Sequence, residues 1–279
     1  MLEDLPLATG RVVLGHTGDR LEQRSPEIVA EAEPRALIEL GSGSAAKTRV
    51  LLDAMSDAGC LETYCPVDIS EEITRDTANR IVDEYDEVDV RGLVCDFELD
   101  LERMPIGGPR MIALLGGTIG NFAPQQRAGF LRRICNLLGP EDSFLLGTDL
   151  VKDRETLEAA YDDSQGVTAE FNKNVLEVIN RELEANFDLG LFEHHAYWDP
   201  DNLWVDIRLR SMARQVVTVS ALGLTVSFDA GEEMRTEIST KFARQGLEGI
   251  YAEAGLEMAA WWTDPEGLYA LSLARPSAV

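Results

Sequence analysis

The chain has 279 residues, 45% of them hydrophobic and 7% aromatic, and it carries a formal net charge of −25 at pH 7. A chain of this length and composition can bury a sizeable core, in one large domain or two interleaved ones, which excludes global disorder. The acidity and the lack of any basic stripe argue against nucleic acid or an anionic membrane as a partner, since phosphate contacts need clusters of Lys and Arg.

Targeting signals and cysteine spacing predict the compartment. The first residues lack the charged-then-apolar start of a signal peptide, and no apolar run has the length of a membrane span. The four cysteines follow no zinc-binding spacing, so we expect reduced thiols and no bound metal. These features predict a cytoplasmic protein.

The first predicted elements are a helix over residues 20–33 and, after it, a strand, a loop and a second helix. Residues Ala36–Glu39 predict a buried parallel strand that ends in an acid, and Gly41–Ser44 predict a tight turn of small residues. The apolar stripe from Val50 to Met55 predicts the helix that follows. Together they form the first half of a nucleotide-binding βαβ unit, in which glycines let a ligand approach the backbone.

The acid Glu39, just before the glycine loop, indicates which kind of ligand this unit binds. The pattern is Glu-x-Gly-x-Gly, whereas dinucleotide-binding folds carry Gly-x-Gly-x-x-Gly. A carboxylate here repels a pyrophosphate but suits a ligand whose ammonium lies near the turn. S-adenosylmethionine (SAM) is such a ligand, with a sulfonium, an amine and no phosphate. The loop alone is also compatible with an ordinary strand-to-helix turn of an α/β protein.

Acids also end the next two predicted strands, which cover Glu62–Asp68 and Val88–Phe97. Asp68 lies about twenty residues past the glycine loop, where a carboxylate can accept from both ribose hydroxyls. Asp96 can accept from the adenine amine, and the backbone around Phe97 can reach the ring. Any one of these acids alone could be a solvated loop residue, but an acid after each of three strands is much more specific.

The fourth predicted strand covers residues 109–115 and ends in a glycine-rich loop. The glycines, beginning with Gly116, keep side chains away from the open end of the sheet, where ligands bind in such folds. Asn121 therefore lies at the site, with one acceptor and two donors. A helix over residues 124–138 and a strand over residues 143–151 follow.

The rest of the chain changes character from α/β to mainly β, and its last two strands predict how the sheet closes. Helices are predicted over residues 155–161, from Ala169 to about Asn186, and over residues 241–253. Five short strands are predicted between the last two helices, at residues 194–198, 203–209, 215–219, 224–228 and 236–240. A final antiparallel pair, near residues 258–262 and 269–274, is the usual closure of a SAM-methyltransferase sheet.

We therefore predict an α/β fold: a class I SAM-methyltransferase, Rossmann-like, seven-stranded sheet with an inserted α+β substrate-binding subdomain. The SAM-binding domain is predicted at residues 16–150 plus 242–279, and the substrate-binding subdomain at residues 1–15 plus 151–241.

Nine stretches of the sequence resemble the histidine Nα-methyltransferase family of ergothioneine biosynthesis, and the resemblance runs from about residue 35 to residue 275. Several of these stretches are long and unusual, which makes chance a poor explanation. The nine are Ile38–Gly43, Gly117–Asn121, Leu146–Asp153, Ala160–Asp163, Gly166–Asn172, Val178–Leu183, Phe228–Glu233, Thr236–Phe242 and Trp261–Asp264.

The resemblance implies a SAM-dependent transferase that methylates the α-amine of histidine three times and gives the betaine hercynine. It implies that Asn121 and Tyr161 hold the substrate carboxylate, that Thr168 and Phe171 line the amine end, and that these four form the catalytic group. It also implies that Glu237 and Ser239 bind the imidazole. With the acids and glycines above, the expected SAM-binding residues are Glu39, Gly41, Ser42, Gly43, Lys47, Asp68, Asp96, Phe97 and Gly116.

The chain departs from the family pattern at two places. The segment Leu5–Arg11 lacks both tyrosines of a motif whose tyrosines close over the substrate, and Ile207 stands where the family places a Met against the imidazole. These departures leave open a different amino acid or amine as the acceptor, or a homologue that binds SAM and an amino acid without catalysis. Either way we expect a small-molecule substrate, no nucleic acid, no membrane and a monomer.

Overall fold

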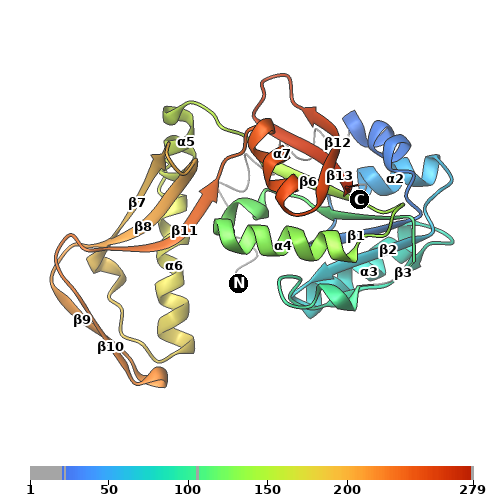
Figure 1. Ribbon diagram of the computed structural model, residues 1–279. Coiled ribbons are helices and arrows are strands. Elements are labelled where there is room, and N and C mark those ends of the chain that lie inside the picture. The colour runs from blue at the N-terminus through green and yellow to red at the C-terminus, as the bar shows by residue number, and fades with distance from the viewer. Residues whose placement is uncertain (1–20, 22, 105–106, 278–279) are drawn as a thin grey trace. The chain divides into compact units, whose positions relative to one another are not determined.

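The computed structural model describes residues 21, 23–104 and 107–277. The chain divides into two compact units: one contains Val151–Lys241, and the other contains the described residues up to Leu150 together with those from Phe242 onward. Expectations for residues 1–20, including the Leu5–Arg11 segment, lie outside the described residues. Figure 1 labels the elements along the chain.

The larger unit is built on one mainly parallel sheet with the strand order β12-β13-β6-β5-β1-β2-β3. A further strand, β4, also pairs with β2, so that β3 and β4 share one edge position; β13 runs antiparallel to both neighbours. This arrangement confirms the predicted fold class. The strands are β1 (Ala36–Leu40), β2 (Thr63–Asp68), β3 (Asp89–Val90), β4 (Leu93–Val94), β5 (Arg110–Leu114), β6 (Ser143–Asp149), β12 (Leu256–Thr263) and β13 (Tyr269–Pro276).

Helices cover both faces of this sheet because its strands are apolar on both sides. Helices α4 (Pro124–Leu137) and α7 (Arg244–Glu253) pack on one face with Ile38 and Leu40 in their cluster, as Figure 1 shows. The other face carries Leu37 and packs against α2 and α3 and the first helical segment. These helices are α2 (Arg49–Asp57), α3 (Glu71–Glu84) and residues 23–32.

The prediction of one continuous strand over Val88–Phe97 is wrong. The structure has two short strands there, separated by Arg91 and Gly92. A Cβ at Gly92 would lie 3.0 Å from the Thr74 Cγ2 of α3, so the chain approaches that helix closely at the break. Glycine also weakens a strand interior, which accounts for the interruption.

The predicted start of the helix at Lys241 is also wrong, because α7 begins at Arg244. The backbone N–H of Lys241 donates to the Leu203 carbonyl at 2.7 Å, and that of Phe242 donates to the Asp149 carbonyl at 2.8 Å. Both groups are therefore paired with strand ends instead of helical neighbours.

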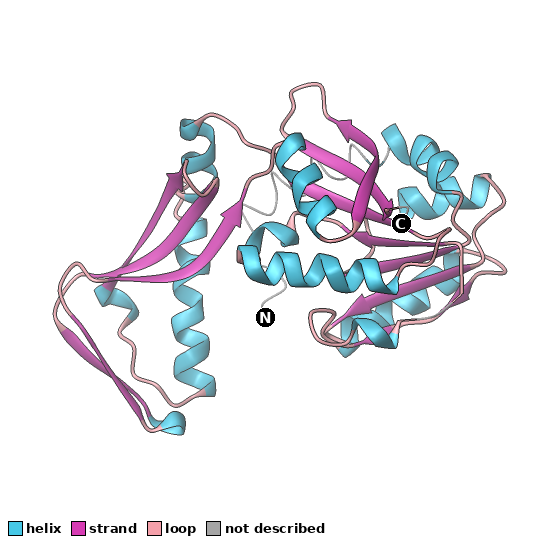
Figure 2. Ribbon diagram, viewed as in Figure 1, coloured by secondary structure: helices cyan, strands magenta, loops and turns pink. Residues whose placement is uncertain are grey.

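The smaller unit contains two helices and two antiparallel sheets, shown in Figure 2, and its five predicted strands are confirmed. The predicted helix to Asn186 ends early, because the chain after Glu182 turns and the Asn186 N–H donates to the Thr218 carbonyl of a strand. The helices are α5 (Arg154–Tyr161) and α6 (Val167–Glu182); the strands are β7 (Phe192–Asp199), β8 (Trp204–Ser211), β9 (Gln215–Val219), β10 (Leu224–Phe228) and β11 (Glu233–Thr240).

Short 3₁₀ helices complete the secondary structure. They are η1 (Leu101–Arg103), η2 (Thr118–Asn121), η3 (Leu189–Leu191) and η4 (Ser220–Leu222). Across the described part of the chain, no helix combines the length and apolar character that crossing a membrane requires.

Candidate active site

The glycine loop after β1 encloses a cavity of about 260 Å³ in the larger unit. Gly41 and Gly43 have φ angles of +68° and +50°, which an L side chain rarely adopts, and no atom lies within 4 Å of where a Cβ on Gly43 would stand. Six expected SAM-binding residues line this cavity: Glu39, Gly41, Ser42, Gly43, Lys47 and Gly116.

Ser42 supplies an observation that bears on a ligand. Its hydroxyl is buried, yet no group among the described residues forms a hydrogen bond with it. A buried polar atom without a partner is costly, and a ligand in the adjoining cavity would supply one. The polar loop and its open backbone fit a ligand such as SAM.

Glu39 lies at the base of the cavity and is only 5% exposed. Its carboxyl accepts hydrogen bonds from the Thr48 hydroxyl and, at 2.6 Å, from the Tyr64 hydroxyl. Burial raises the pKa of Glu39 to about 7, although these two hydrogen bonds and the charge of Lys47 act in the opposite direction. Glu39 therefore links β1 to the residue before α2 and to β2, as well as lining the cavity.

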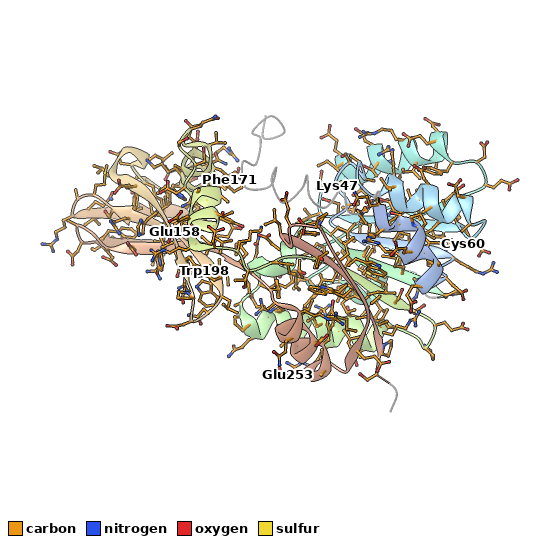
Figure 3. The ribbon with its side chains drawn as sticks, turned by 90° about the horizontal axis from the view of Figure 1, so that it is seen from above. Lys47, Cys60, Glu158, Phe171, Trp198 and Glu253 are labelled. Carbon is orange, nitrogen blue, oxygen red and sulfur yellow. The ribbon has the colours of Figure 1, made fainter. Side chains whose placement is uncertain are left out.

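Lys47, labelled in Figure 3, lies two residues before α2 on the rim of the same cavity. Burial lowers the pKa of Lys47 to about 8, and the charge of Glu39 acts against that shift. Burial therefore shifts both groups toward their neutral forms, and the attraction between their charges opposes both shifts.

Asp68 ties the second strand to the glycine loop. Its Oδ2 accepts from the backbone N–H of Gly43 at 3.0 Å, and its Oδ1 accepts from that of Ser70 at 3.1 Å. The Thr77 hydroxyl fixes the same loop by donating to the Gly43 carbonyl at 2.7 Å. The expected ribose acceptor is therefore held in a defined orientation beside the loop.

Asp96 and Phe97 lie after β4, next in the row of strand ends. Asp96 Oδ1 accepts from the Glu98 N–H at 2.8 Å, which fixes the turn after the strand. The Phe97 ring packs against the core and lies 6.2 Å from the Phe130 ring, edge to face. A Cβ on Gly41 would lie 3.7 Å from Phe97, so this ring borders the glycine loop.

The exit loop of β5 carries the two remaining expected residues of the larger unit. The Gly116 N–H donates to the Tyr269 hydroxyl at 3.2 Å, which anchors the loop to β13. Asn121 ends η2 with an exposed side chain.

The smaller unit brings Tyr161, Ser239 and Lys241 into a closed triangle of hydrogen bonds. The Tyr161 and Ser239 hydroxyls are 2.7 Å apart, and the Lys241 ammonium donates to each of them at 2.7 Å. Tyr161 ends α5, whereas the other two come from the end of β11 and the residue after it. All three side chains are buried.

Glu237 lies two residues before Ser239 on β11, and side chains two apart on a strand point to the same face. Burial raises the pKa of Glu237, and the charge of Lys241 acts against that shift. Opposite Glu237 on β8 lies Ile207, which is 3% exposed and packs in one cluster with Tyr161. A carboxyl, two hydroxyls and an apolar wall therefore meet on one surface of the smaller unit.

Thr168 and Phe171 lie in the first turns of α6, and Figure 3 labels Phe171 on that helix. Asp163 fixes the start of the helix by accepting from the N–H groups of Val167 and Thr168, at 3.1 and 2.8 Å. Thr168 is buried, whereas Phe171 is 41% exposed, which leaves its ring available to a ligand.

Two groups near Tyr161, the buried Lys241 and the half-buried His194, were not singled out from the sequence. Lys241 stands inside the family-like stretch Thr236–Phe242, but a lysine after a strand is ordinarily a solvated residue. His194 holds the Tyr161 carbonyl through its Nε2 at 2.7 Å, and its Nδ1 lies 2.9 Å from the Asn172 amide nitrogen. Both residues are identified by their tertiary contacts, which a local sequence pattern does not show.

Comparison with known proteins gives one family. Residues 19–276 match the family described as histidine-specific methyltransferase, SAM-dependent. The chain is 49% identical over 254 residues to the histidine N-alpha-methyltransferase of Mycolicibacterium smegmatis, covering 91% of this chain and 79% of the relative. The protein of the same name from Mycobacterium tuberculosis is 48% identical over the same shares.

Solved structures agree on the fold. The CcbJ methyltransferase from Streptomyces caelestis aligns with a TM-score of 0.52 and 14% identity, covering 93% of this chain and 96% of that one. A SAM-dependent methyltransferase from Clostridium acetobutylicum aligns with a TM-score of 0.51 and 10% identity, covering 93% and 92%. At these identities the likeness shows a shared class I methyltransferase fold.

Proposed function

The chain belongs to the family of histidine-specific, SAM-dependent methyltransferases, and we propose that it methylates the α-amine of L-histidine three times to give hercynine. The observation that carries the proposal is the surface of the smaller unit on which Glu237 and Ser239 share one strand face beside the Tyr161 hydroxyl. Its donors and acceptors are complementary to an amino acid with a polar ring.

SAM supplies an electrophilic methyl group on a sulfonium. The protein's own contribution is to hold a neutral amine in line with that group, because displacement at a methyl carbon needs positioning more than covalent catalysis. We assign SAM binding to the glycine loop. Asp68 then accepts hydrogen bonds from the ribose hydroxyls, and Ser42 is a further polar contact.

The substrate carboxylate needs hydrogen-bond donors. We assign this role to the Tyr161 hydroxyl and the Asn121 amide, which are both uncharged hydrogen-bond donors. The first turns of α6, with Thr168 and Phe171, are assigned to the amine end.

The imidazole needs an acceptor for its N–H. Glu237 provides the acceptor, and its partly buried position makes an apolar side chain a poor fit, since the carboxyl would then lose its partner. Ser239 provides the hydroxyl beside it. We further propose that no metal ion takes part and that the chain works as a monomer in the cytoplasm.

Ile207 favours a second candidate, in which the same reaction is directed at another amino acid or amine. Its side chain is branched at Cβ and buried against Tyr161, so it shapes the wall opposite Glu237 more rigidly than a Met would.

An acceptor panel tests the proposal. The protein is incubated with SAM and a set of amino acids and amines, and S-adenosylhomocysteine and product masses are followed. Mass gains of one, two and three methyl groups on histidine support the proposal. Turnover with another acceptor alone supports the second candidate, and S-adenosylhomocysteine binding without turnover of any acceptor refutes both.

A further inference from the structure

Lys241 is a buried cation that none of the roles assigned above uses. It is the last residue of the smaller unit, and only 1% of it is exposed. Its Nζ donates to the Tyr161 and Ser239 hydroxyls at 2.7 Å each and lies 4.6 Å from the centre of the Tyr161 ring. Taking an ammonium out of water is expensive, so a buried lysine at this position indicates that its charge is needed there.

The triangle restricts what the two hydroxyls can do. An ammonium only donates, so the oxygens of Tyr161 and Ser239 must each accept from Lys241. The two hydroxyls then share one bond, at 2.7 Å, which uses one of their two hydrogens. One hydroxyl hydrogen is left to point away from the triangle, and a carboxylate beside Tyr161 would draw it to the phenol oxygen.

The charge itself has a second consequence. A methyl acceptor must be a neutral amine, and an α-amino acid in that form, with an uncharged side chain, carries one net negative charge on its carboxylate. An ammonium one hydrogen bond behind the Tyr161 hydroxyl favours this form over the zwitterion, which has no net charge.

We propose that Lys241 is a positioning residue for the α-carboxylate of the substrate, acting through Tyr161. It orients the phenol as a donor toward the carboxylate, and its positive charge favours the substrate whose amine is neutral. The inference rests on the proposed function in one respect, the assignment of the α-carboxylate to Tyr161.

Lys241→Met tests this inference, because methionine has nearly the same length without the charge or the donors. We expect the KM for histidine to rise about tenfold or more, as for the loss of a charge-assisted hydrogen bond, and the acidic limb of the kcat profile, which reports the amine of the bound substrate, to move to higher pH. Affinity for S-adenosylhomocysteine should stay within about twofold, since its expected contacts lie in the other unit. A merely structural role would not move the pH profile.

A carboxylate-free ligand makes the test specific. Histamine lacks the α-carboxylate, so its affinity for the complex with S-adenosylhomocysteine, measured by calorimetry, should differ little between the wild type and the variant. The affinity for histidine should fall in the variant. Lys173→Met, on α6 of the same unit, is the matched control and should leave both affinities unchanged. Should Lys241→Met fail to fold, as circular dichroism would show, Lys241→Gln removes the charge and keeps a hydrogen-bond donor on a slightly shorter side chain.

The outcomes separate the inference from the proposed function. A folded Lys241 variant with the wild-type preference for histidine over histamine overturns the inference, even if histidine is the substrate. A wild-type protein that turns over a different amino acid overturns the proposed function, and the same comparison of that amino acid with its decarboxylated amine then decides on Lys241. A wild-type protein that binds no amino acid overturns both.

Discussion

At the scale of single residues, the buried carboxyl of Glu39 makes stability depend on pH. Its pKa is about 7 in the folded protein against 4.5 as a free side chain. Between these values the folded state holds more protons than the unfolded state, so the Glu39 contribution to stability falls as pH rises from about 4.5 to 7. The cost is complete above pH 7 and amounts to roughly 3 kcal/mol at most.

Glu39→Gln should remove this dependence. We expect the free energy of unfolding of the variant, relative to wild type, to increase by about 1–3 kcal/mol between pH 5 and pH 8, measured by urea denaturation at both values. Glu62→Gln serves as the control, since Glu62 is exposed, and should show little pH-dependent difference. If the difference in unfolding free energy between Glu39→Gln and wild type is the same at pH 5 and pH 8, this carboxyl is ionised throughout the range.

Glu237 should determine which methyl acceptor is used and should have little effect on binding of the methyl donor. For Glu237→Ala we expect kcat/KM for histidine to fall by about 10²-fold or more, because the imidazole N–H loses its acceptor. S-adenosylhomocysteine affinity, measured by calorimetry, should stay within about twofold. Equal losses of histidine use and cofactor affinity would refute the assigned role, and Glu193→Ala, on exposed β7 surface, gives the baseline.

Single residues also show where sequence-based prediction stops. The strand-end acids Glu39, Asp68 and Asp96 were identified because the ends of parallel strands share one edge of a sheet. The sequence did not show that Glu39 is held by Thr48 and Tyr64, or that Lys241 is buried, since these depend on side chains brought together from distant segments. The roles of the expected site residues stay predictions until the variants above are measured.

At the scale of elements, Asp163 caps the helix that carries Thr168 and Phe171. The N–H of Thr168 is the main cause that holds the pKa of Asp163 at about 2. This stabilisation is present above the ordinary pKa of an aspartate and is lost as pH falls toward 2.

Asp163→Ala should lower the free energy of unfolding by about 1 kcal/mol near neutral pH, as for the loss of an N-cap, and raise the KM for histidine through the loosened start of α6. Asp163→Asn keeps an acceptor and should retain most of the stability. Asp153→Ala removes the N-cap carboxylate of α5 and tells whether the change in KM belongs to α6. Stability and KM unchanged in Asp163→Ala would contradict this role.

Elements with a strong periodic pattern, such as α4 and β6, were predicted closely, whereas boundaries fixed by distant partners were not. The edge strand breaks at Gly92 because of its approach to α3, and α6 ends early because the following chain pairs with β9. Such competition between local preference and tertiary hydrogen bonding is not encoded in a short window of sequence.

At the scale of the whole molecule, the chain has 50 acidic residues and 25 basic ones. Repulsion among like charges destabilises a compact chain, and salt screens it. Raising NaCl from about 10 mM to about 150 mM shortens the screening length from about 30 Å to about 8 Å and should raise Tm by a few degrees. KCl at equal ionic strength should act alike, and a Tm that is constant or falls would mean that attractive ion pairs outweigh the repulsion.

The fold class of the whole molecule was predictable because the patterns in the sequence agree: buried apolar strands alternate with amphipathic helices from β1 to α4. The β insertion was also visible, since alternating strands replace the helical pattern from Phe192 to Thr240. Substrate identity is harder to predict, because it depends on a few side chains such as Ile207 and Glu237 that the fold does not specify.

The most direct test of the account is the structure of the product formed from histidine and SAM. The account predicts a product with three methyl groups, all of them on the α-nitrogen, giving a single N-trimethyl signal in the proton NMR spectrum and an unmodified imidazole. Methyl groups on a ring nitrogen, or formation of S-adenosylhomocysteine without any methylated histidine, would contradict it.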